Sequence, residues 1–268
     1  MLHREPNFNH EAILRAWYTE RKQQFDASLA VTVRNGEFVT NGNPIKAFVR
    51  DWTLWGMQLV PSWRKQLEKG PRDKMTRYKH EDGLPFLLEF NGGLQLPQVF
   101  AWDFVESRVV FTDDLLFPLG KKGLFQLLIL LNRPEEVSEA LEACKGAASL
   151  SDNRVLEDEA TVLIQDFGAW MDNALLSTTT VKIARIATGE EFAADPVLYR
   201  NRPPPDGYDA FRLRRELGTD VKFVVVRPDR FVYAACRTSD ELRRCLQRLE
   251  CVLQSSTGES SIARQSKL

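Results

Sequence analysis

The sequence has few of the residues that build metal sites and disulfides. It carries three histidines and four cysteines among 268 residues. The histidines lie far apart, without cysteine or carboxylate partners at ligand spacing, and no two cysteines form a C-x-x-C pair. We therefore expect no metal site and no dithiol redox chemistry, and we expect the thiols to be buried in a reducing intracellular setting. The residues concerned are His3, His10, His80, Cys144, Cys236, Cys245 and Cys251.

Long apolar runs are also lacking. The longest, Leu124 to Leu131, has the length of a strand and falls well short of the roughly 20 residues that span a bilayer. Residues 1–7 contain no apolar core of the kind that a signal peptide needs. Secretion and a membrane partner are therefore not expected.

Charge of one sign is not in excess, because the formal net charge is −1. The charges are unevenly distributed along the chain. Residues 1–80 contain 14 Lys+Arg and 8 Asp+Glu, residues 81–199 contain 8 Lys+Arg and 20 Asp+Glu, and residues 200–268 contain 14 Lys+Arg and 9 Asp+Glu. A nucleic-acid partner is not expected, because the basic residues are dispersed rather than gathered with stacking aromatics. The asymmetry favours segments that pack on one another or on a partner.

The standard catalytic and nucleotide-binding motifs are absent. The chain has no G-x-G-x-x-G, no G-x-x-x-x-G-K-[ST] and no G-x-S-x-G. Asn91-Gly92-Gly93 is interpreted as a turn, and Asp113-Asp114 as the acidic start of a helix rather than a catalytic pair. No catalytic, cofactor-binding or metal-binding residue is assigned.

The first 80 residues predict helices. One is expected over His10–Val33, ended by the turn signal Asn35-Gly36. A second is expected over Asp51–Lys69, capped by Asp51 and kinked by Pro61. Three tryptophans recur near helical spacing and indicate a core or an interface, namely Trp52, Trp55 and Trp63.

The following residues predict an α/β unit. The run over 124–131 is typical of a strand buried on both faces, and Pro134-Glu135-Glu136 opens a helix after it. Further strands are expected at Val162–Ile164 and Val181–Ile183, and a short helix at Phe211–Leu217 before Gly218.

The clearest local pattern lies near the C-terminus. Val221–Val226 and Phe231–Ala235 predict a hairpin, and Thr238–Glu241 predicts a capping box before an amphipathic helix. A strand–helix–strand followed by a hairpin and a helix is the layout of a thioredoxin-like fold. We therefore predict an α/β chain with three parts: a mainly helical segment 1–80, a thioredoxin-like domain 81–254 and a flexible tail 255–268.

The last three residues, Ser266-Lys267-Leu268, match a peroxisomal targeting signal. The peroxisomal import receptor is therefore an expected partner and the peroxisome the expected location, with the cytoplasm as the alternative.

Four segments resemble the flavin-dependent aromatic hydroxylases. Leu14–Arg21 resembles the family's L-x-x-Y-x-x-E-R helix, with Glu20 and Arg21 in the matching places, and Phe48–Asp51 resembles its "LRD", through Arg50 and Asp51. Gly93–Gln98 resembles its G-x-x-x-P-Q, and Val226–Val232 its VRPDRFV hairpin, through Arg227, Pro228, Asp229 and Arg230. The likeness runs over roughly residues 10–253 and is strongest to the phenol hydroxylase and hydroxyphenylpropionate hydroxylase branch.

The resemblance implies an NAD(P)H-dependent monooxygenase of secondary metabolism that uses FAD to hydroxylate a phenolic or polyketide-type aromatic. It also implies a flavin-binding half, whose three motifs this chain lacks. This chain alone is therefore expected to hold FAD weakly or not at all. Glu20, Arg21, Arg50 and Asp51 are expected to form a structural ion-pair network.

Two interpretations remain open at this stage. In the first, the chain is the C-terminal piece of an aromatic monooxygenase: either a split gene encodes it and it pairs with a flavin-binding polypeptide, or the gene model is truncated. The helix at 10–33 motivates this interpretation, because alone it would leave apolar surface uncovered. In the second, it is a non-catalytic module for homodimerisation or for binding a small aromatic molecule. A thiol oxidoreductase is disfavoured by the missing C-x-x-C.

Overall fold

The chain forms two compact units in a computed structural model that describes residues 10–69, 76–170, 176, 179–195 and 207–254. One unit spans Leu14–Lys79 and is helical; the other contains residues 10–13 and the described residues from His80 onward. Each unit is described by itself below. No helix in the described ranges is both long enough and apolar enough to cross a membrane.

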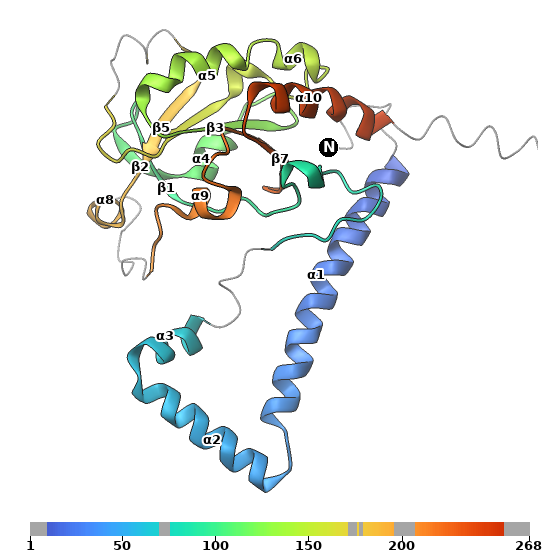
Figure 1. Cartoon of the computed structure of the whole chain (residues 1–268), viewed down its shortest axis with the longest axis vertical. Helices are drawn as coiled ribbons and strands as arrows, with labels where there is room; N and C mark the ends of the chain where they lie inside the picture. Colours follow the sequence, from blue (N-terminus) through green and yellow to red (C-terminus); the bar gives the residue numbers. More distant parts are fainter. Residues whose placement is uncertain (1–9, 70–75, 171–175, 177–178, 196–206, 255–268) are drawn as a thin grey trace, which may run out of the picture. The chain divides into compact units, whose positions relative to one another are not determined.

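The helical unit is built from α1 (His10–Val39), α2 (Pro44–Leu59) and α3 (Pro61–Lys69) (Figure 1). The predicted end of the first helix at Asn35-Gly36 is wrong. The helix continues to Val39, and the amide of Thr40 still donates to the Gly36 carbonyl at 2.8 Å. A glycine inside a helix costs only about 1 kcal/mol, so helical hydrogen bonding continues past this one.

The start of the second helix is also corrected. Asn43 caps α2, because its side-chain oxygen accepts from the amides of Ile45 and Lys46 at 3.0 and 3.3 Å, and Pro44 occupies the first turn. A proline there is favourable, because it has no amide hydrogen to leave unpaired. Asp51 therefore lies inside the helix. Pro61 separates α2 from α3 rather than kinking one helix, because Val60 adopts an extended conformation before it.

The second unit contains a sheet of seven strands in the order β2-β1-β5-β4-β3-β6-β7. Strands β3, β4 and β5 are mutually parallel neighbours, whereas β1–β2, β1–β5, β3–β6 and β6–β7 are antiparallel. The strands are β1 (Phe100–Asp103), β2 (Arg108–Phe111), β3 (Gln126–Leu131), β4 (Thr161–Ile164), β5 (Lys182–Ile186), β6 (Phe223–Val226) and β7 (Val232–Cys236).

The predicted thioredoxin-like topology is confirmed. Strands β3 and β4 pair in parallel and are joined by a helical crossover, and the β6–β7 hairpin continues the sheet beside β3 before helix α10. The sequence did not predict β1 and β2, which extend this core together with β5. These two strands have only four residues each, too few for a clear alternating pattern.

Helices cover both faces of the sheet (Figure 1). Helices α5, α6 and α10 lie on one face, and α4 and α9 lie on the other. The helical segments of this unit are η2 (Leu88–Phe90), α4 (Thr112–Leu116), η3 (Pro134–Glu136), α5 (Val137–Ala143), α6 (Ala147–Leu150), η4 (Glu157–Glu159), α8 (Gly189–Ala194), α9 (Arg212–Leu217) and α10 (Ser239–Gln254).

The core of this unit centres on β3, all six residues of which are buried. Leu127, Ile129 and Leu131 belong to one apolar cluster with residues of α5 and α10. Successive side chains of a strand point to opposite faces, so Leu128 and Leu130 lie on the other face, toward α4 and α9. A strand covered on both sides reads as one continuous apolar run, as the sequence predicted.

The predicted start of α10 is also confirmed. The Thr238 hydroxyl accepts from the amide of Glu241 at 3.2 Å, and the Glu241 carboxylate accepts from the amide of Arg237 at 2.7 Å. Leu242 and Leu249 on its apolar stripe are buried. The helix is thereby oriented with its apolar side on the sheet.

Candidate functional site

Two of the motifs that carry the family resemblance lie together, although about 130 residues separate them. The amide of Gly93 donates to the Val232 carbonyl at 2.9 Å, and the amide of Val232 donates to the Leu94 carbonyl at 2.8 Å. The amide of Leu96 donates to the Arg230 carbonyl at 2.7 Å. The segment Gly93–Gln98 therefore runs along the outer side of the β6–β7 hairpin.

Side chains also join this segment to the hairpin. Arg230 forms an ion pair of 2.9 Å with Asp113, and Gln98 donates to the same Asp113 oxygen at 3.0 Å. Burial raises the pKa of Asp113, and the neighbouring Arg230 opposes that rise. Asp113 lies in the first turn of α4, as the acidic dipeptide predicted, and it ties that helix to the hairpin.

The hairpin turn is held by its own charged residues. The Arg227 guanidinium donates to both carboxylate oxygens of Asp229, at 3.1 and 2.6 Å. Arg230 has a φ of 69°, in the left-handed region, and its amide donates to the Arg227 carbonyl at 3.0 Å. Pro228 lies between them and needs no amide partner. These contacts stabilise a tight turn and give the motif a structural role.

The motif residues of the helical unit are spread over two helices. Glu20 is buried on α1, and the Arg21 guanidinium donates to Gln24 at 3.1 Å. Arg50 pairs with Asp51 at 2.8 Å and donates to the Val39 carbonyl at 2.6 Å. Arg50 therefore satisfies a carbonyl at the end of α1 and fixes the turn between α1 and α2.

The helical unit exposes an unusual amount of apolar side chain. No residue of α2 is buried, and Trp52, Trp55 and Trp63 are 57%, 56% and 51% exposed. On α2 the apolar residues recur three and four positions apart, which places them on one stripe of the helix. We call this surface the apolar face; it comprises Ile45, Phe48, Val49, Trp52, Trp55, Leu59, Val60, Trp63 and Leu67.

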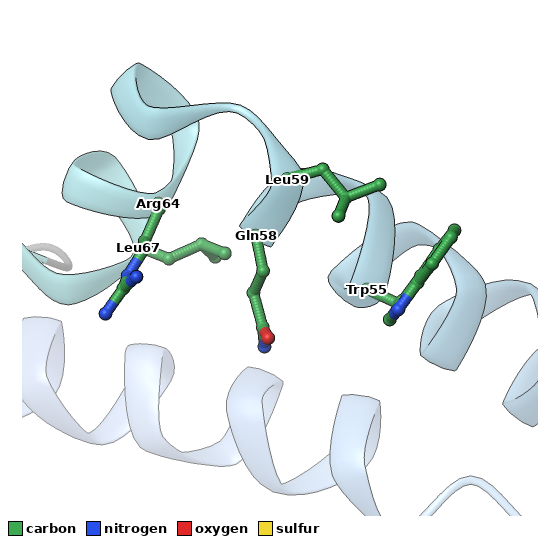
Figure 2. Close-up of a pocket in the computed structure, with 5 residues that line it drawn as sticks. All are labelled: Trp55, Gln58, Leu59, Arg64 and Leu67. Carbon is green, nitrogen blue, oxygen red and sulfur yellow. The ribbon is translucent and has the colours of Figure 1, made fainter.

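A pocket of about 620 Å³ lies at the elbow between α2 and α3. Trp55 and Leu59 line it from α2, and Leu67 reaches across from α3 (Figure 2). The polar ends of Gln58 and Arg64 extend to the same side of the elbow. Apolar walls with one guanidinium and one amide suit a ligand that has both an apolar body and an acceptor group. The sequence did not indicate this pocket, because it depends on the break at Pro61.

Two of the buried thiols are neighbours: Cys236 and Cys245 share a hydrogen bond, and this bond together with burial raises the pKa of Cys245. Cys144, Cys236 and Cys245 are buried, and burial raises the pKa of Cys144 to about 12. In thioredoxin-like redox proteins a C-x-x-C accompanies the βαβ unit. Here the segment between β3 and α5 begins with Asn132 and Arg133 instead. The raised pKa values of Cys144 and Cys245 keep these two thiols protonated, the form that is not nucleophilic.

The glycine pair Gly92-Gly93 leaves no room for the pyrophosphate of a dinucleotide such as FAD. A dinucleotide needs glycines with open space above them so that the pyrophosphate can approach the backbone. A Cβ built on Gly92 would lie 2.4 Å from the Tyr233 carbonyl, and one on Gly93 would lie 2.8 Å from the Phe86 ring. Protein atoms already fill this space. Within the described ranges, no group of three or more His, Cys, Asp or Glu side chains is arranged to hold a metal.

No protein-family model matches the chain, and no curated protein matches it in sequence. Solved structures match in part. The flavin-dependent monooxygenase PieE, solved with FAD and substrate, is 18% identical with a TM-score of 0.33, and the match covers 62% of this chain and 20% of PieE. The matched part of the chain thus spans only one fifth of the length of that monooxygenase.

Two copper-bound proteins are similar as well. Yeast Sco1 is 11% identical with a TM-score of 0.37, and the match covers 61% of this chain and 95% of Sco1. ScoI of Bradyrhizobium japonicum is 17% identical with a TM-score of 0.27, covering 57% of this chain and 98% of ScoI.

Proposed function

We propose that this chain is one part of a flavin-dependent aromatic hydroxylase of the phenol hydroxylase type, and that a separate polypeptide holds FAD. The whole assembly would hydroxylate a phenolic or polyketide-type aromatic at the expense of NAD(P)H. The order and spacing of the four family-like motifs support the proposal. The observation that carries it is the apolar face of α2 and α3.

An apolar face of this size stabilises the chain only when it is covered. Each fully buried Leu or Phe side chain contributes about 1.5–3 kcal/mol relative to its exposed state, and tryptophans are enriched at the centres of protein interfaces. Two basic residues accompany the apolar ones, Lys46 and Arg64. We therefore propose a partner surface with an apolar centre and an acidic rim.

The proposed division of labour rests on the missing G-x-G-x-x-G motif and on the filled space at Gly92 and Gly93. FAD would supply the redox chemistry from the partner's side of the assembly. This chain would contribute helices α2 and α3, which would bind the partner, and the thioredoxin-like unit.

The proposal predicts that replacing tryptophans on the apolar face separates the chain from a flavoprotein. Tagged wild-type chain, expressed in its native cells, is expected to co-purify a polypeptide with a visible flavin absorption band and phenol-stimulated NAD(P)H oxidation. The double variant Trp52→Glu/Trp55→Glu is expected to lose both signals. Interface tryptophans contribute about 2 kcal/mol or more each, so affinity should fall by roughly 1,000-fold.

Trp170→Glu is the matched control, because Trp170 is 74% exposed but belongs to the α/β unit. It should retain the flavin band. The proposal is wrong if the purified chain is a soluble monomer whose apolar face binds no hydrophobic dye, or if the co-purified material contains no flavin.

The elbow pocket favours a second candidate, a module that binds a small aromatic molecule. Trp55 offers a ring for stacking, and Arg64 offers a donor to a phenolate or carboxylate. Calorimetry with a panel of phenols and hydroxybenzoates is expected to give heat with anionic members, weakened about tenfold in Arg64→Gln but not in Arg34→Gln. Absence of heat with every member would exclude this candidate.

The proposal also includes the location of the protein in the cell. Ser266, Lys267 and Leu268 lie outside the described residues, and we propose that they direct the chain to peroxisomes through the import receptor.

A further inference from the structure

A pocket of about 310 Å³ lies within the α/β unit, at the edge of the sheet where β3 ends. Strand β6 is antiparallel to β3, and β7 is antiparallel to β6, so β6 begins and β7 ends at this same edge. The amide of Leu130 donates to the Lys222 carbonyl at 2.8 Å, and the amide of Lys222 donates to the Cys236 carbonyl at 2.9 Å. In open α/β sheets, ligands bind at the carboxyl ends of the strands, and this pocket has that position.

The floor of the pocket is apolar and belongs to the core. Leu131, Ala140 and Phe223 line it, and all three are buried members of the main apolar cluster. Helix α5 forms one wall, and the residues that lead into α10 form another; both helices lie on the same face of the sheet (Figure 1). The walls are therefore held by elements that pack on the core.

The polar residues that line the pocket carry charges of both signs. Two acids come from the α5 side, two bases come from the ends of β6 and β7, and two hydroxyl groups come from the start of α10. These residues are Glu136, Glu139, Lys222, Arg237, Thr238 and Ser239. The formal charges of the lining therefore cancel.

Two of the charged side chains are already held by the protein. Glu136 accepts from the amide of Arg133 at 3.1 Å and forms a long ion pair of 3.9 Å with Lys222. Arg237 forms an ion pair of 2.8 Å with Asp220. These contacts fix the positions of Glu136 and Arg237 at the rim.

Other polar groups of the pocket are available to a ligand. Neither the Glu139 carboxylate nor the Ser239 hydroxyl has a hydrogen bond or an ion pair within the part of the chain that the structure describes. The ammonium of Lys222 lies beyond hydrogen-bond distance of Glu136. The pocket thus offers one acceptor on the α5 side and two donors on the side of β6 and α10.

We propose that this pocket binds a small zwitterion with an apolar side chain, either a free amino acid or a dipeptide. The ammonium group of the ligand pairs with Glu139, and its carboxylate accepts from Lys222 and Ser239. Its side chain covers the apolar floor. About 300 Å³ is the lower end of the range for small-molecule sites, so the pocket suits a ligand of this size and not a longer peptide.

Ligands with charge of one sign fit this pocket less well. A phosphate or a dicarboxylate would meet the two acids, and a polyamine would meet the two bases. A neutral apolar molecule would cover charged groups without pairing them. Each mismatch weakens binding, because a charge loses its water and gains no partner. A ligand with one charge of each sign satisfies both sides.

Isothermal titration calorimetry of the full chain with L-leucine and L-leucyl-L-leucine tests the proposal. At least one of the two is expected to bind, and the tighter one shows whether the ligand is an amino acid or a dipeptide. The N-acetyl form of that compound lacks the ammonium group, and its amide form lacks the carboxylate. Each is therefore expected to bind about tenfold more weakly.

Two variants connect each charge of the ligand with one side of the pocket. Glu139→Gln is expected to weaken binding of the zwitterion about tenfold without weakening the N-acetyl form, which has no ammonium group to lose. Lys222→Gln is expected to do the same without weakening the amide form. Glu142→Gln is the matched control and should bind as the wild type does, because Glu142 is exposed on the same helix but does not line the pocket.

The circular dichroism spectrum of each variant shows that the chain is still folded. Ser239→Ala removes only a hydroxyl group and is expected to weaken the zwitterion severalfold, so it replaces a charge variant that does not fold. No heat with either leucine compound up to about 10 mM would overturn the proposal. Unchanged affinity in Glu139→Gln, Lys222→Gln and Ser239→Ala would also overturn it, as would binding that is lost in Arg64→Gln, which would place the ligand in the elbow pocket.

Discussion

Replacing Ile129 by aspartate is expected to unfold the α/β unit. Ile129 is fully buried in β3, where its neighbours are Val162 of β4 and Phe223 of β6. A carboxylate at this position would be surrounded by apolar side chains without a hydrogen-bond partner. The cost exceeds about 4 kcal/mol, which is comparable with the whole stability of an ordinary domain, about 5–15 kcal/mol.

Circular dichroism during urea titration measures the effect of Ile129→Asp. The strand signal is expected to be lost without denaturant, while the α1–α3 helices can keep part of the helical signal. Leu119→Asp is the control, because Leu119 is fully exposed and its replacement should change stability by no more than about 0.5 kcal/mol. A folded Ile129→Asp protein with the wild-type urea midpoint would contradict the position of β3 in the core.

Gly92→Ala is expected to be the second most damaging single change, with a loss of about 3 kcal/mol in the free energy of unfolding. A Cβ at this position would lie 2.4 Å from the Tyr233 carbonyl and 2.8 Å from the Leu87 carbonyl, both of which are backbone atoms. The same carbonyls accept hydrogen bonds of 2.9 Å from Leu87 and Gly92. The methyl group therefore forces apart the contact between the segment at 87–92 and β7.

Gly36→Ala provides the opposite control for that substitution. Gly36 lies inside α1, and a Cβ there would have nothing within 4 Å. Alanine is the better helix former by about 1 kcal/mol, so this variant should be as stable as the wild type or slightly more stable. Thermal unfolding of the two variants side by side measures the contrast. Similar melting temperatures for both would show that residues 87–92 do not pack on β7 as described.

Much of the thioredoxin-like core was predictable because its signals are local. The run from Leu124 to Leu131 is apolar at every position except Gln126. The Thr238–Glu241 capping box indicates the start of α10 through contacts between residues three or four positions apart. The ends of the helices were harder to predict from the sequence. Asn35-Gly36 resembles a stop signal, yet helical hydrogen bonding continues to the Gly36 carbonyl. Asp51 has the side chain of a capping residue, but Asn43 caps α2.

The candidate sites were less predictable than the fold. The elbow pocket exists because Pro61 begins a new helix, which brings Leu67 opposite Gln58. The hydrogen bond from Lys121 to the Glu159 carbonyl likewise joins residues 38 positions apart. It depends on the parallel pairing of β3 with β4, which no local pattern specifies.

By itself the sequence determined which segments are helices or strands near the C-terminus, and where the hairpin turns, because these depend on interactions between residues a few positions apart. Only the tertiary structure decided that Gly93–Gln98 lies along that hairpin and that the tryptophans of α2 and α3 stay exposed. Such features depend on strand order and on which surfaces are covered, and these follow from the packing of the whole chain.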